Sequence, residues 1–587
     1  MALYKFLTPF VMTPSIKRVY FDQNSSFICP TAKVISDARI SNQTIIRRSG
    51  NYKPPIWKHE YIQSLNSEFK GEIYVERFNK LKEEVGVLIN QIKDDPLKRL
   101  ELIDTLQRLG ISYHFENEIK DVLKGKYEKR CECDDWKKNN LYAISLEFRL
   151  LRQHGFNVSQ EIFHNFKDET KNFSTRLYQD LNGMLSLYEA SFLCIEGENI
   201  LEEAKHFTIN YLEKYMRSCK DEYKASIIRH ALELPLHWRM SRLDTRWFID
   251  IYERKVDMNP ILLEIAKLDF NRVQCLYQED LKYASRWWRS TRFSEKLSFA
   301  RDRLMQNFLW SVGVGFEPQL SYFRRMFTKV VAIITTIDDI YDVYGTLDEL
   351  ELFTEAVERW NVDVLDQLPY YMKICFLGLH NSINEMAFDA LRDKRTNVTQ
   401  YLKKMWVDLC KSYMLEAKWY HTGYKPTLEE YLDNAWISVG GPLALVHAYV
   451  LTSPMLQDME SLEENIDIVR CSSIILRLAD DLGTSTVELE KGDVPKSIQC
   501  YMNDTGASEN NAREHIKSLI SETWKKLNTM EVKNSIFPHV FIEIAKNLAR
   551  MGHCMYQHGD GHGTGCQEIN DGVMSLFIQP ISMQHIY

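Results

Sequence analysis

The apolar residues of this chain recur at helical rather than strand spacing, and this periodicity constrains the fold more than any other feature. Proline and glycine, which interrupt helices, are scarce, with 16 and 24 among 587 residues. Few stretches alternate apolar with polar residues as a half-buried strand does. The sequence therefore predicts a nearly all-α protein. A chain of this length exceeds what one hydrophobic core organises, so we expect two domains.

Charge and cysteine usage narrow the classes of function. The net charge is −8 and there is no extended basic stripe, which argues against nucleic acid as a partner. The 12 cysteines are scattered without zinc-site spacing, as in reduced proteins of an intracellular compartment. No apolar stretch reads as a membrane span, so we expect no stable membrane insertion.

One apolar run, from Val330 to Gly345, has helical length and carries three carboxylates near its end, Asp338, Asp339 and Asp342. A helix this apolar is normally buried, and burying an unpaired carboxylate costs on the order of several kcal/mol. Asp338 and Asp342 are four residues apart and share one helix face. Oxygen ligands without Cys or His nearby suit Mg²⁺, which also binds substrate phosphates. Taken alone, the cluster also fits a solvated acidic helix end.

A second acidic face lies in the run from Leu476 to Asp493. Asp480, Thr484 and Glu488 are spaced by four residues, so one helix face presents a carboxylate, a hydroxyl and a second carboxylate. Such a set suits a further Mg²⁺, although an amphipathic surface helix would look the same. Two such faces on two apolar helices together predict three Mg²⁺ ions around a diphosphate.

The two runs, DDIYD and DDLGTSTVE, resemble the metal-binding motifs of class I plant terpene synthases. Arg301-Asp302-Arg303 resembles the arginine pair that receives the departing diphosphate in that family. Arg47-Arg48, followed by Trp57, resembles the tandem-arginine motif of plant monoterpene synthases. Blocks such as LQRLGISYHF and SRWWR also read as family sequence, so the resemblance extends from Arg47 to the C-terminus.

The resemblance implies an all-α fold of two domains. An N-terminal α-barrel without catalytic residues is expected over residues 47–256, and a class I terpene synthase bundle with both metal motifs over residues 257–587. The acidic motif of class II enzymes has only a poor match, at residues 132–135 in a hydrophilic segment, so we expect no class II chemistry.

Residues 1–46 differ in composition from the rest of the chain. They hold nine Ser or Thr, five Lys or Arg and only two acidic residues. This is typical of an organelle transit peptide, although a disordered tail would look similar. In this family a transit peptide implies the plastid stroma, with cleavage near Arg47.

The resemblance also assigns roles to the charged residues. Asp338 and Asp342 are expected to hold two Mg²⁺ ions, with Asp339 beside them or in the outer coordination shell. The third ion is expected on the second face, with Mn²⁺ as a substitute metal. Four cationic side chains are expected to bind the diphosphate, with ordinary surface pairing as the alternative: Arg301, Arg303, Arg477 and Lys496.

Further predictions concern the hydrocarbon end of the site. Trp310 matches the family's pocket tryptophan and would stabilise a carbocation through its ring face. Ser438 and Gly440 precede Pro442, where a helix should break and leave carbonyl dipoles facing the cation. Tyr556 and His562, in a glycine-rich segment, would take a proton or orient water, unless the diphosphate is the base and they only shape the pocket.

The tandem arginines stand before a proline-containing segment that cannot form a long helix. Arg47 and Arg48 are therefore expected to belong to an extended strap across the mouth of the site. Surface pairing is the alternative.

The substrate is expected to be geranyl diphosphate. Val331, two helical turns before Asp338, and Leu476 are smaller than the bulky residues of isoprene-forming relatives, so the cavity should hold more than five carbons. Because valine cannot anchor a water, we expect an acyclic product such as linalool, myrcene or ocimene. A cyclic product, farnesyl diphosphate as substrate, a prenyl-elongating transferase and a non-catalytic binding protein remain open, as does the choice between monomer and homodimer.

Overall fold

The computed structural model describes residues 47–583 except residues 48, 93–94, 129–137, 455, 457–465, 491–493, 533–536 and 563–565. The side chains of residues 486–490 also lie outside the description. The transit-peptide prediction for residues 1–46, the class II-like segment at 132–135 and Arg48 therefore lie outside the described residues.

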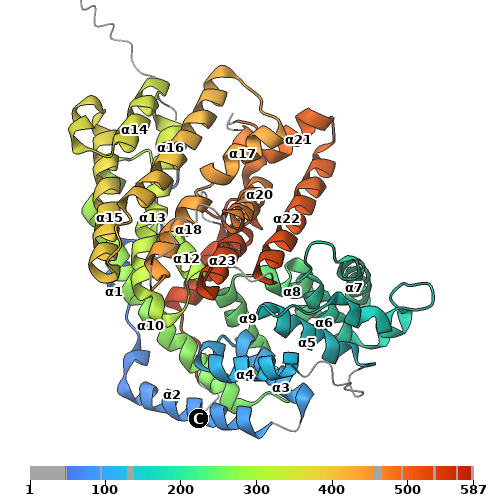
Figure 1. Ribbon diagram of the computed structural model, residues 1–587. Helices are drawn as coiled ribbons and strands as arrows, with labels where there is room; N and C mark the ends of the chain where they lie inside the picture. Colours follow the sequence, from blue (N-terminus) through green and yellow to red (C-terminus); the bar gives the residue numbers. More distant parts are fainter. Residues whose placement is uncertain are drawn as a thin grey trace, which may run out of the picture. The chain divides into compact units, whose positions relative to one another are not determined.

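The all-α prediction is confirmed. The described residues contain no β-strand and are mostly helical, with turns and short 3₁₀ segments between the helices (Figure 1). The first part of the chain contributes nine α-helices: α1 His59–Ser64, α2 Glu72–Gln91, α3 Pro96–Arg108, α4 Glu116–Glu128, α5 Leu141–Gln153, α6 Leu181–Ser191, α7 Asn199–Ser218, α8 Glu222–Glu233 and α9 Ser241–Glu253.

The second part contains the longest helices, several of them apolar on most of their surface. Its helices are α10 Pro260–Thr291, α11 Phe293–Lys296, α12 Leu304–Val314, α13 Ser321–Asp339, α14 Leu347–Arg359, α15 Tyr370–Lys394, α16 Thr399–Thr422, α17 Leu428–Ser438, α18 Gly441–Thr452, α20 Asp467–Glu490, α21 Ser497–Thr505, α22 Glu509–Val532, α23 His539–Tyr556 and α24 Gln567–Val573.

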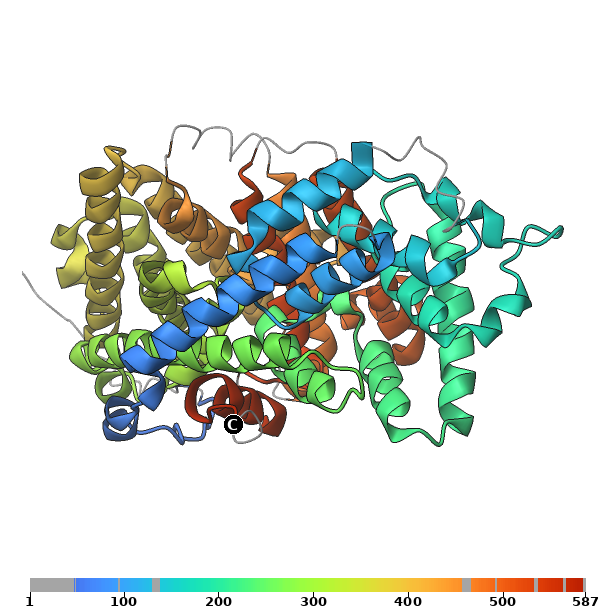
Figure 2. The ribbon, with the colours of Figure 1, turned by 90° about the horizontal axis from the view of Figure 1, so that it is seen from below.

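Helix α10 connects the two parts. Asn259 caps its first turn by accepting the backbone N–H groups of Ile261 and Leu262, and Pro260 stands at its first position, where no N–H is needed. The helix packs on α2 and α9 on one side and on α12 and α13 on the other, and Figure 2 shows α2 lying across it. Residues 47–587 accordingly form one compact unit. The predicted domain boundary at 256/257 falls in the turn between α9 and α10, and the division itself stays a prediction.

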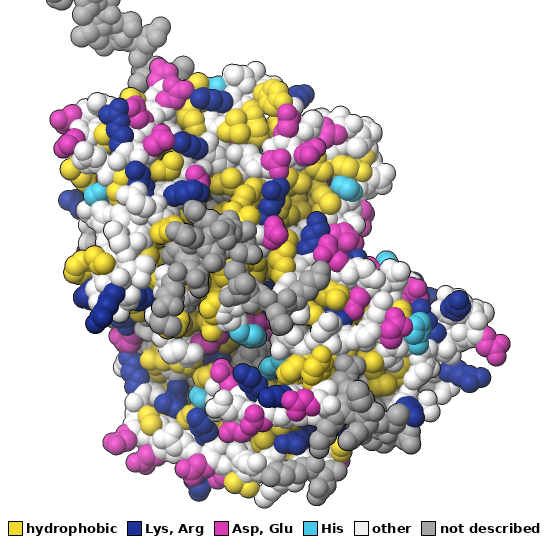
Figure 3. All heavy atoms as spheres, viewed as in Figure 1, with side chains coloured by type: hydrophobic (Ala, Val, Ile, Leu, Met, Phe, Trp, Pro, Cys, Tyr) yellow, Lys and Arg dark blue, Asp and Glu magenta, His cyan; other side chains and the backbone are white. Residues whose placement is uncertain are grey.

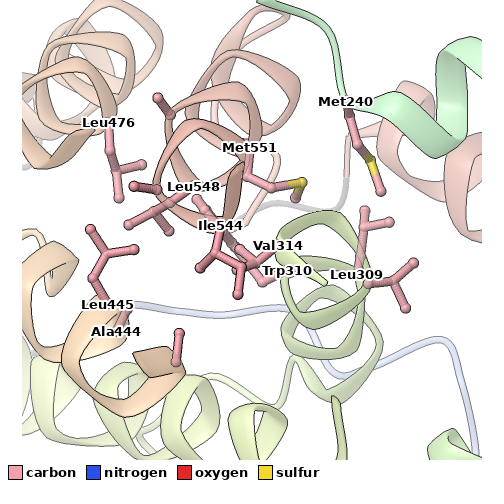
Figure 4. Close-up of a cluster of buried hydrophobic side chains, with 14 of the residues drawn as sticks. Met240, Leu309, Trp310, Val314, Ala444, Leu445, Leu476, Ile544, Leu548 and Met551 are labelled. Carbon is pink, nitrogen blue, oxygen red and sulfur yellow. The ribbon is translucent and has the colours of Figure 1, made fainter. Parts of the chain in front are cut away.

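The core of the second part lies where α12, α13, α18, α20 and α23 meet. Each of these helices turns an apolar face inward, and burying such faces is the main stabilising contribution to the fold. Figure 4 shows side chains from four of these helices converging on one point. They include Leu309 and Trp310 of α12, Ala444 and Leu445 of α18, Leu476 of α20, and Leu548 and Met551 of α23.

The expectation that no stretch has the length of a membrane span is wrong. Residues 428–452 are long and apolar enough by composition, with a mean hydropathy of 1.4 in their most apolar window. That window is 78% buried inside the protein, because α17 and α18 are core helices. The stretch is also interrupted at Gly440, whose φ of +78° ends α17 and starts α18. Its hydropathy is therefore accounted for by packing within the fold.

The outer surface is mixed in charge. On the face drawn in Figure 3, Lys and Arg side chains are interspersed with Asp and Glu, and hydrophobic side chains gather between them over the second part of the chain. No broad region of one charge covers the described residues on this face, so nothing on it indicates a polyanionic partner.

Candidate active site

Residues of the two acidic runs, which the sequence predicts to bind metal around one diphosphate, line one cavity of about 160 Å³ bounded by α12, α13, α16, α17, α18, α20 and α23. The cavity lining has a charged part, made of the carboxylates and cations, and an uncharged part that includes Trp310, Phe327 and Ala444. Of the residues predicted for the site, those in its lining are Arg301, Trp310, Val331, Asp338, Asp342, Ser438, Gly440, Arg477, Asp480, Thr484, Lys496, Tyr556 and His562.

The first acidic wall is the end of α13. The helix widens there into a π-helical turn, Ile340–Tyr344, which Gly345 closes by donating its N–H to the carbonyl of Ile340 at 2.8 Å. This turn carries Asp342, so Asp338 and Asp342 face the cavity from successive turns. The Asp338 carboxylate is 27% exposed and pairs with the guanidinium of Arg301.

Asp339 points away from the cavity. Its carboxylate is fully buried, and its Oδ2 accepts the backbone N–H of Arg301 at 2.6 Å and the Nε–H of the same residue at 3.2 Å; the carboxylate also accepts a hydrogen bond from the Tyr52 hydroxyl. Adjacent residues on a helix point about 100° apart, which separates Asp339 from Asp338. Asp339 therefore holds the segment that carries Arg301. Its predicted place beside the metal ions remains a prediction.

The second acidic wall is the middle of α20. Asp480 and Thr484 line the cavity one turn apart, and Arg477, one turn earlier, pairs with Asp480. The neighbouring Asp481 is fully buried and is not in the cavity lining; it accepts the hydroxyl of Tyr431 at 3.0 Å and pairs with Arg477 at 2.8 Å. Glu488 belongs to the same helix, but its side chain lies outside the described residues.

Three of the four predicted diphosphate-binding cations, Arg301, Arg477 and Lys496, line the charged part of the cavity. Burial alone would lower the pKa of Arg301, but Asp339 and Asp338 outweigh it and raise the pKa well above its ordinary value. Arg303 does not line the cavity. Its Nη1 donates to the carbonyl of Lys53 at 2.9 Å, so its contact with diphosphate remains a prediction.

Two residues near the start of the described chain contact the surroundings of the first acidic wall: Arg47 contacts the π-turn at Tyr344, and Lys53 accepts a hydrogen bond from Arg303. Arg47 donates two hydrogen bonds of 2.8 Å to Glu349 and one of 2.9 Å to the carbonyl of Tyr344, the last residue of the π-turn. Burial alone would raise the pKa of Glu349, but hydrogen bonds from Arg47, Thr346 and Tyr371 lower it to about 2. Arg47 is thus fixed beside the first acidic wall, and the strap across the mouth of the site stays a prediction.

His562 lines the cavity and is buried, unlike an ordinary loop histidine. The indole N–H of Trp310 donates to its Nδ1 at 3.3 Å, so its Nε2 carries the hydrogen and faces Thr335 Oγ1 at 3.1 Å. Burial, followed by Arg301 and Arg303, lowers the pKa of His562 to about 3. The ring is therefore neutral near pH 7.

The break between α17 and α18 also faces the cavity, as predicted. Ser438, Val439 and Gly440 line it. Pro442, at the second position of α18, has no N–H, so the Ser438 carbonyl has no helical partner. This carbonyl can present its dipole to a bound ligand.

Four polar side chains in the lining were missed by sequence reasoning: Thr335, Tyr413, Glu416 and Asp560. Thr335 could have been found from the sequence, because it lies four residues after Val331 and so on the same face of α13. Asp560 stands in the glycine-rich segment after α23, where an acidic residue next to His562 was also visible. Tyr413 and Glu416, on α16, belong to no motif.

The donor set fits a hard cation. Asp338, Asp342, Asp480 and Thr484 offer only oxygen atoms, the ligands that Mg²⁺ prefers. Within the described ranges, three potential ligand atoms lie within 4.8 Å of one another only at Glu531, His539 and Glu543, where Lys546 already pairs with both carboxylates. The cavity carboxylates are thus spread along two walls.

Two family models match the chain. One is described as "Terpene synthase, N-terminal domain" and matches residues 56–232, and the other as "Terpene synthase family, metal binding domain" and matches residues 289–526. The chain is 60% identical to a protein named Terpene synthase 10 from Ricinus communis, over 94% of this chain and 100% of that protein. It is 58% identical to a chloroplastic myrcene synthase from Quercus ilex, over 96% and 94%.

Solved structures agree with the sequence comparisons. Limonene synthase bound to 2-fluorolinalyl diphosphate superposes with a TM-score of 0.89 at 46% identity, covering 92% of this chain and 100% of that one. Isoprene synthase from grey poplar leaves, in complex with three Mg²⁺ ions and dimethylallyl-S-thiolodiphosphate, superposes with a TM-score of 0.83 at 46% identity, covering 90% and 99%. Matches over both parts of the chain, together with two acidic walls on one cavity, show that this protein belongs to the terpene synthase family.

Proposed function

We propose that this protein is a Mg²⁺-dependent monoterpene synthase that ionises geranyl diphosphate and releases diphosphate. One observation carries the proposal: Asp338 and Asp342 of α13 line the same cavity as Asp480 and Thr484 of α20. The relatives named for monoterpene products, including myrcene and terpineol synthases, support the same substrate class.

The proposed metal ligands are Asp338 and Asp342 on one wall, and Asp480, Thr484 and Glu488 on the other. Bound Mg²⁺ would neutralise the diphosphate and act as a Lewis acid for its departure, and Mn²⁺ is a candidate substitute. Because the carboxylates are spread along two walls, substrate oxygens would complete the coordination shells.

The chain's own cations would bind the leaving group. Arg301, Arg477 and Lys496 line the charged part of the cavity and can donate charge-assisted hydrogen bonds to phosphate oxygens. Arg301 and Arg477 each pair with one wall carboxylate. Binding of diphosphate therefore requires these guanidinium groups to divide their hydrogen bonds between carboxylate and phosphate.

The uncharged part of the cavity lining would bind the hydrocarbon. The Trp310 ring and the carbonyl at the helix break offer electron density to a cation, each ring face contributing roughly 0.5–2 kcal/mol. His562 is neutral but engaged by Trp310 and Thr335, so it would receive a proton only by giving up a hydrogen bond. Tyr556 faces Asp480 and Asp560, and burial followed by these carboxylates raises its pKa well above the ordinary value, which keeps it protonated.

The product is proposed to be acyclic, of the linalool, myrcene or ocimene type. Val331 offers no hydrogen-bonding group where it lines the cavity, and relatives named for myrcene and ocimene support this outcome. A cyclic product is the second candidate, because a terpineol synthase and limonene synthase are also similar to this chain. Residues 1–46 are proposed to direct the protein to the plastid, as the chloroplastic names of several relatives support.

The test is gas chromatography of products from geranyl and farnesyl diphosphate, offered separately with Mg²⁺. A monoterpene from geranyl diphosphate alone, without isopentenyl diphosphate, supports the proposal. A product that forms only when isopentenyl diphosphate is added would indicate a prenyl-elongating transferase. No diphosphate release from either substrate would indicate a binding protein.

A further inference from the structure

Glu416 is a buried carboxylate in the cavity lining that belongs to neither acidic motif. It lies on α16, and the residue is only 7% exposed. Burying a carboxylate costs free energy of desolvation unless hydrogen-bond donors compensate for the lost water. The cavity lining therefore contains a buried carboxyl group, outside both metal motifs, that must have a structural or chemical use.

The donors to Glu416 come from the last turns of α17. The Ser438 hydroxyl donates to its Oε1 at 2.5 Å, and Asn434 Nδ2 donates to the same oxygen at 3.0 Å. Asn434 is tied to α16 a second time, because Ser412 Oγ donates to its Oδ1 at 2.8 Å. These bonds join α16 to the end of α17 through side chains that are all buried.

The joined segment is the one that ends in the helix break. Ser438 is the last residue of α17, its carbonyl lacks a helical donor because of Pro442, and Gly440 turns the chain with a positive φ. On the other side, a Cβ at Gly441 would collide with Ser473 Oγ, so the backbone of the break already touches α20. The break is thus held between α20 and the Glu416 carboxylate.

We propose that Glu416 is a positioning residue that fixes the orientation of the helix break and thereby the distribution of products. The inference rests on the proposed function and deepens it. The reacting cation partitions between competing products according to small differences in barrier height, so a tilt of a nearby carbonyl dipole changes the product ratio. Glu416 acts on the cation through Ser438 and not by contact with the reacting atoms.

The structure offers substitutions that separate hydrogen bonding from charge. Glu416→Gln keeps an acceptor oxygen for Ser438 and Asn434 and removes only the charge. Glu416→Leu removes the acceptor, and Ser438→Ala removes one donor while leaving the carboxyl group. Ser311→Ala is the matched control, because Ser311 is a buried, hydrogen-bonded helix serine that does not line the cavity.

The measurement is the ratio of products formed from geranyl diphosphate, with total diphosphate release recorded in parallel. We expect Glu416→Leu and Ser438→Ala each to change the ratio of major to minor products by about three-fold or more, and the double variant to change it no further. Glu416→Gln and Ser311→Ala should keep the parent ratio. If Glu416→Leu fails to fold, Ser438→Ala tests the same bond.

Two outcomes would overturn the inference. An unchanged ratio in Ser438→Ala would show that the bond does not control the break. A ratio in Glu416→Gln that shifts as far as in Glu416→Leu would show that charge, not the hydrogen bond, matters. Failure of the proposed function is a separate result, because the parent protein would then release no diphosphate at all.

Discussion

Asp338 and Asp339 are neighbours in one motif, yet the structure gives them different surroundings, and substitution should separate their roles. Asp338 faces the cavity with a partly exposed carboxylate. Asp339 is fully buried and anchors Arg301 and Tyr52. We predict that Asp338→Asn removes activity with little change in the free energy of unfolding. Asp339→Asn should mainly lower the free energy of unfolding.

The size of each effect can be worked out from the contacts. Breaking a buried ion pair by neutralising one partner costs about 3–5 kcal/mol. Because Arg301 keeps Asp338 as a second partner, we expect the lower end, about 3 kcal/mol, for Asp339→Asn. Asp338→Asn removes a partly exposed pair and should change stability by less than about 1 kcal/mol. Loss of a ligand to a Lewis-acid metal should lower kcat/KM about 100-fold or more.

Two assays are needed on the same samples. Urea unfolding in the absence of metal gives the free energy of unfolding, and diphosphate release from geranyl diphosphate gives kcat/KM. Asp481→Asn is a parallel test, because Asp481 is the corresponding buried neighbour of Asp480 and pairs with Arg477, so this variant should also lower the free energy of unfolding. The reasoning is refuted if Asp339→Asn is as stable as the parent, or if Asp338→Asn loses as much stability as Asp339→Asn.

The same contacts support four further predictions. The pKa of Glu349 is lowered to about 2, so its contribution to the free energy of unfolding is complete above the unfolded pKa near 4.5 and is lost as the pH falls toward 2. Glu349→Gln should abolish this acid-dependent loss and speed proteolysis near Arg47. The folded protein disfavours protonation of His562, whose pKa is about 3, so its contribution to stability is complete above about pH 6.5 and declines as the pH falls toward 3. The NMR signals of His562 should therefore show no titration between pH 5 and 8. Chelation by EDTA should stop diphosphate release, and added Mg²⁺ should restore it; activity that survives chelation would contradict the metal assignment. A truncated chain beginning at Arg47 should stay folded and active, and loss of folding would show that residues 1–46 belong to the fold.

Helical periodicity was enough to predict an all-α protein, and spacing by four was enough to place Asp338 with Asp342 and Asp480 with Thr484. The same reasoning did not separate Asp339, because its partners Tyr52 and Arg301 lie on distant segments. It missed Glu416 for the same reason, since the donors that justify a buried carboxylate belong to another helix.

The apolar stretch at residues 428–452 was overlooked in the sequence, and its hydropathy alone would not have shown its surroundings. Composition records how apolar a stretch is, but not whether lipid or protein surrounds it. The helix break was visible, because Gly440 and Pro442 carry their backbone constraints in the sequence itself. The residues of α16 and α20 that pack against the break depend on tertiary packing, and only the structure identifies them.

The claim that two acidic walls hold one metal–diphosphate assembly can be tested by crystallography with Mn²⁺ and inorganic pyrophosphate, using the anomalous scattering of manganese to locate the ions. We predict manganese sites beside both Asp338 and Asp480, bridged by a single pyrophosphate that also contacts Arg301 and Arg477. Manganese on only one wall, or pyrophosphate bound away from both walls, would contradict it.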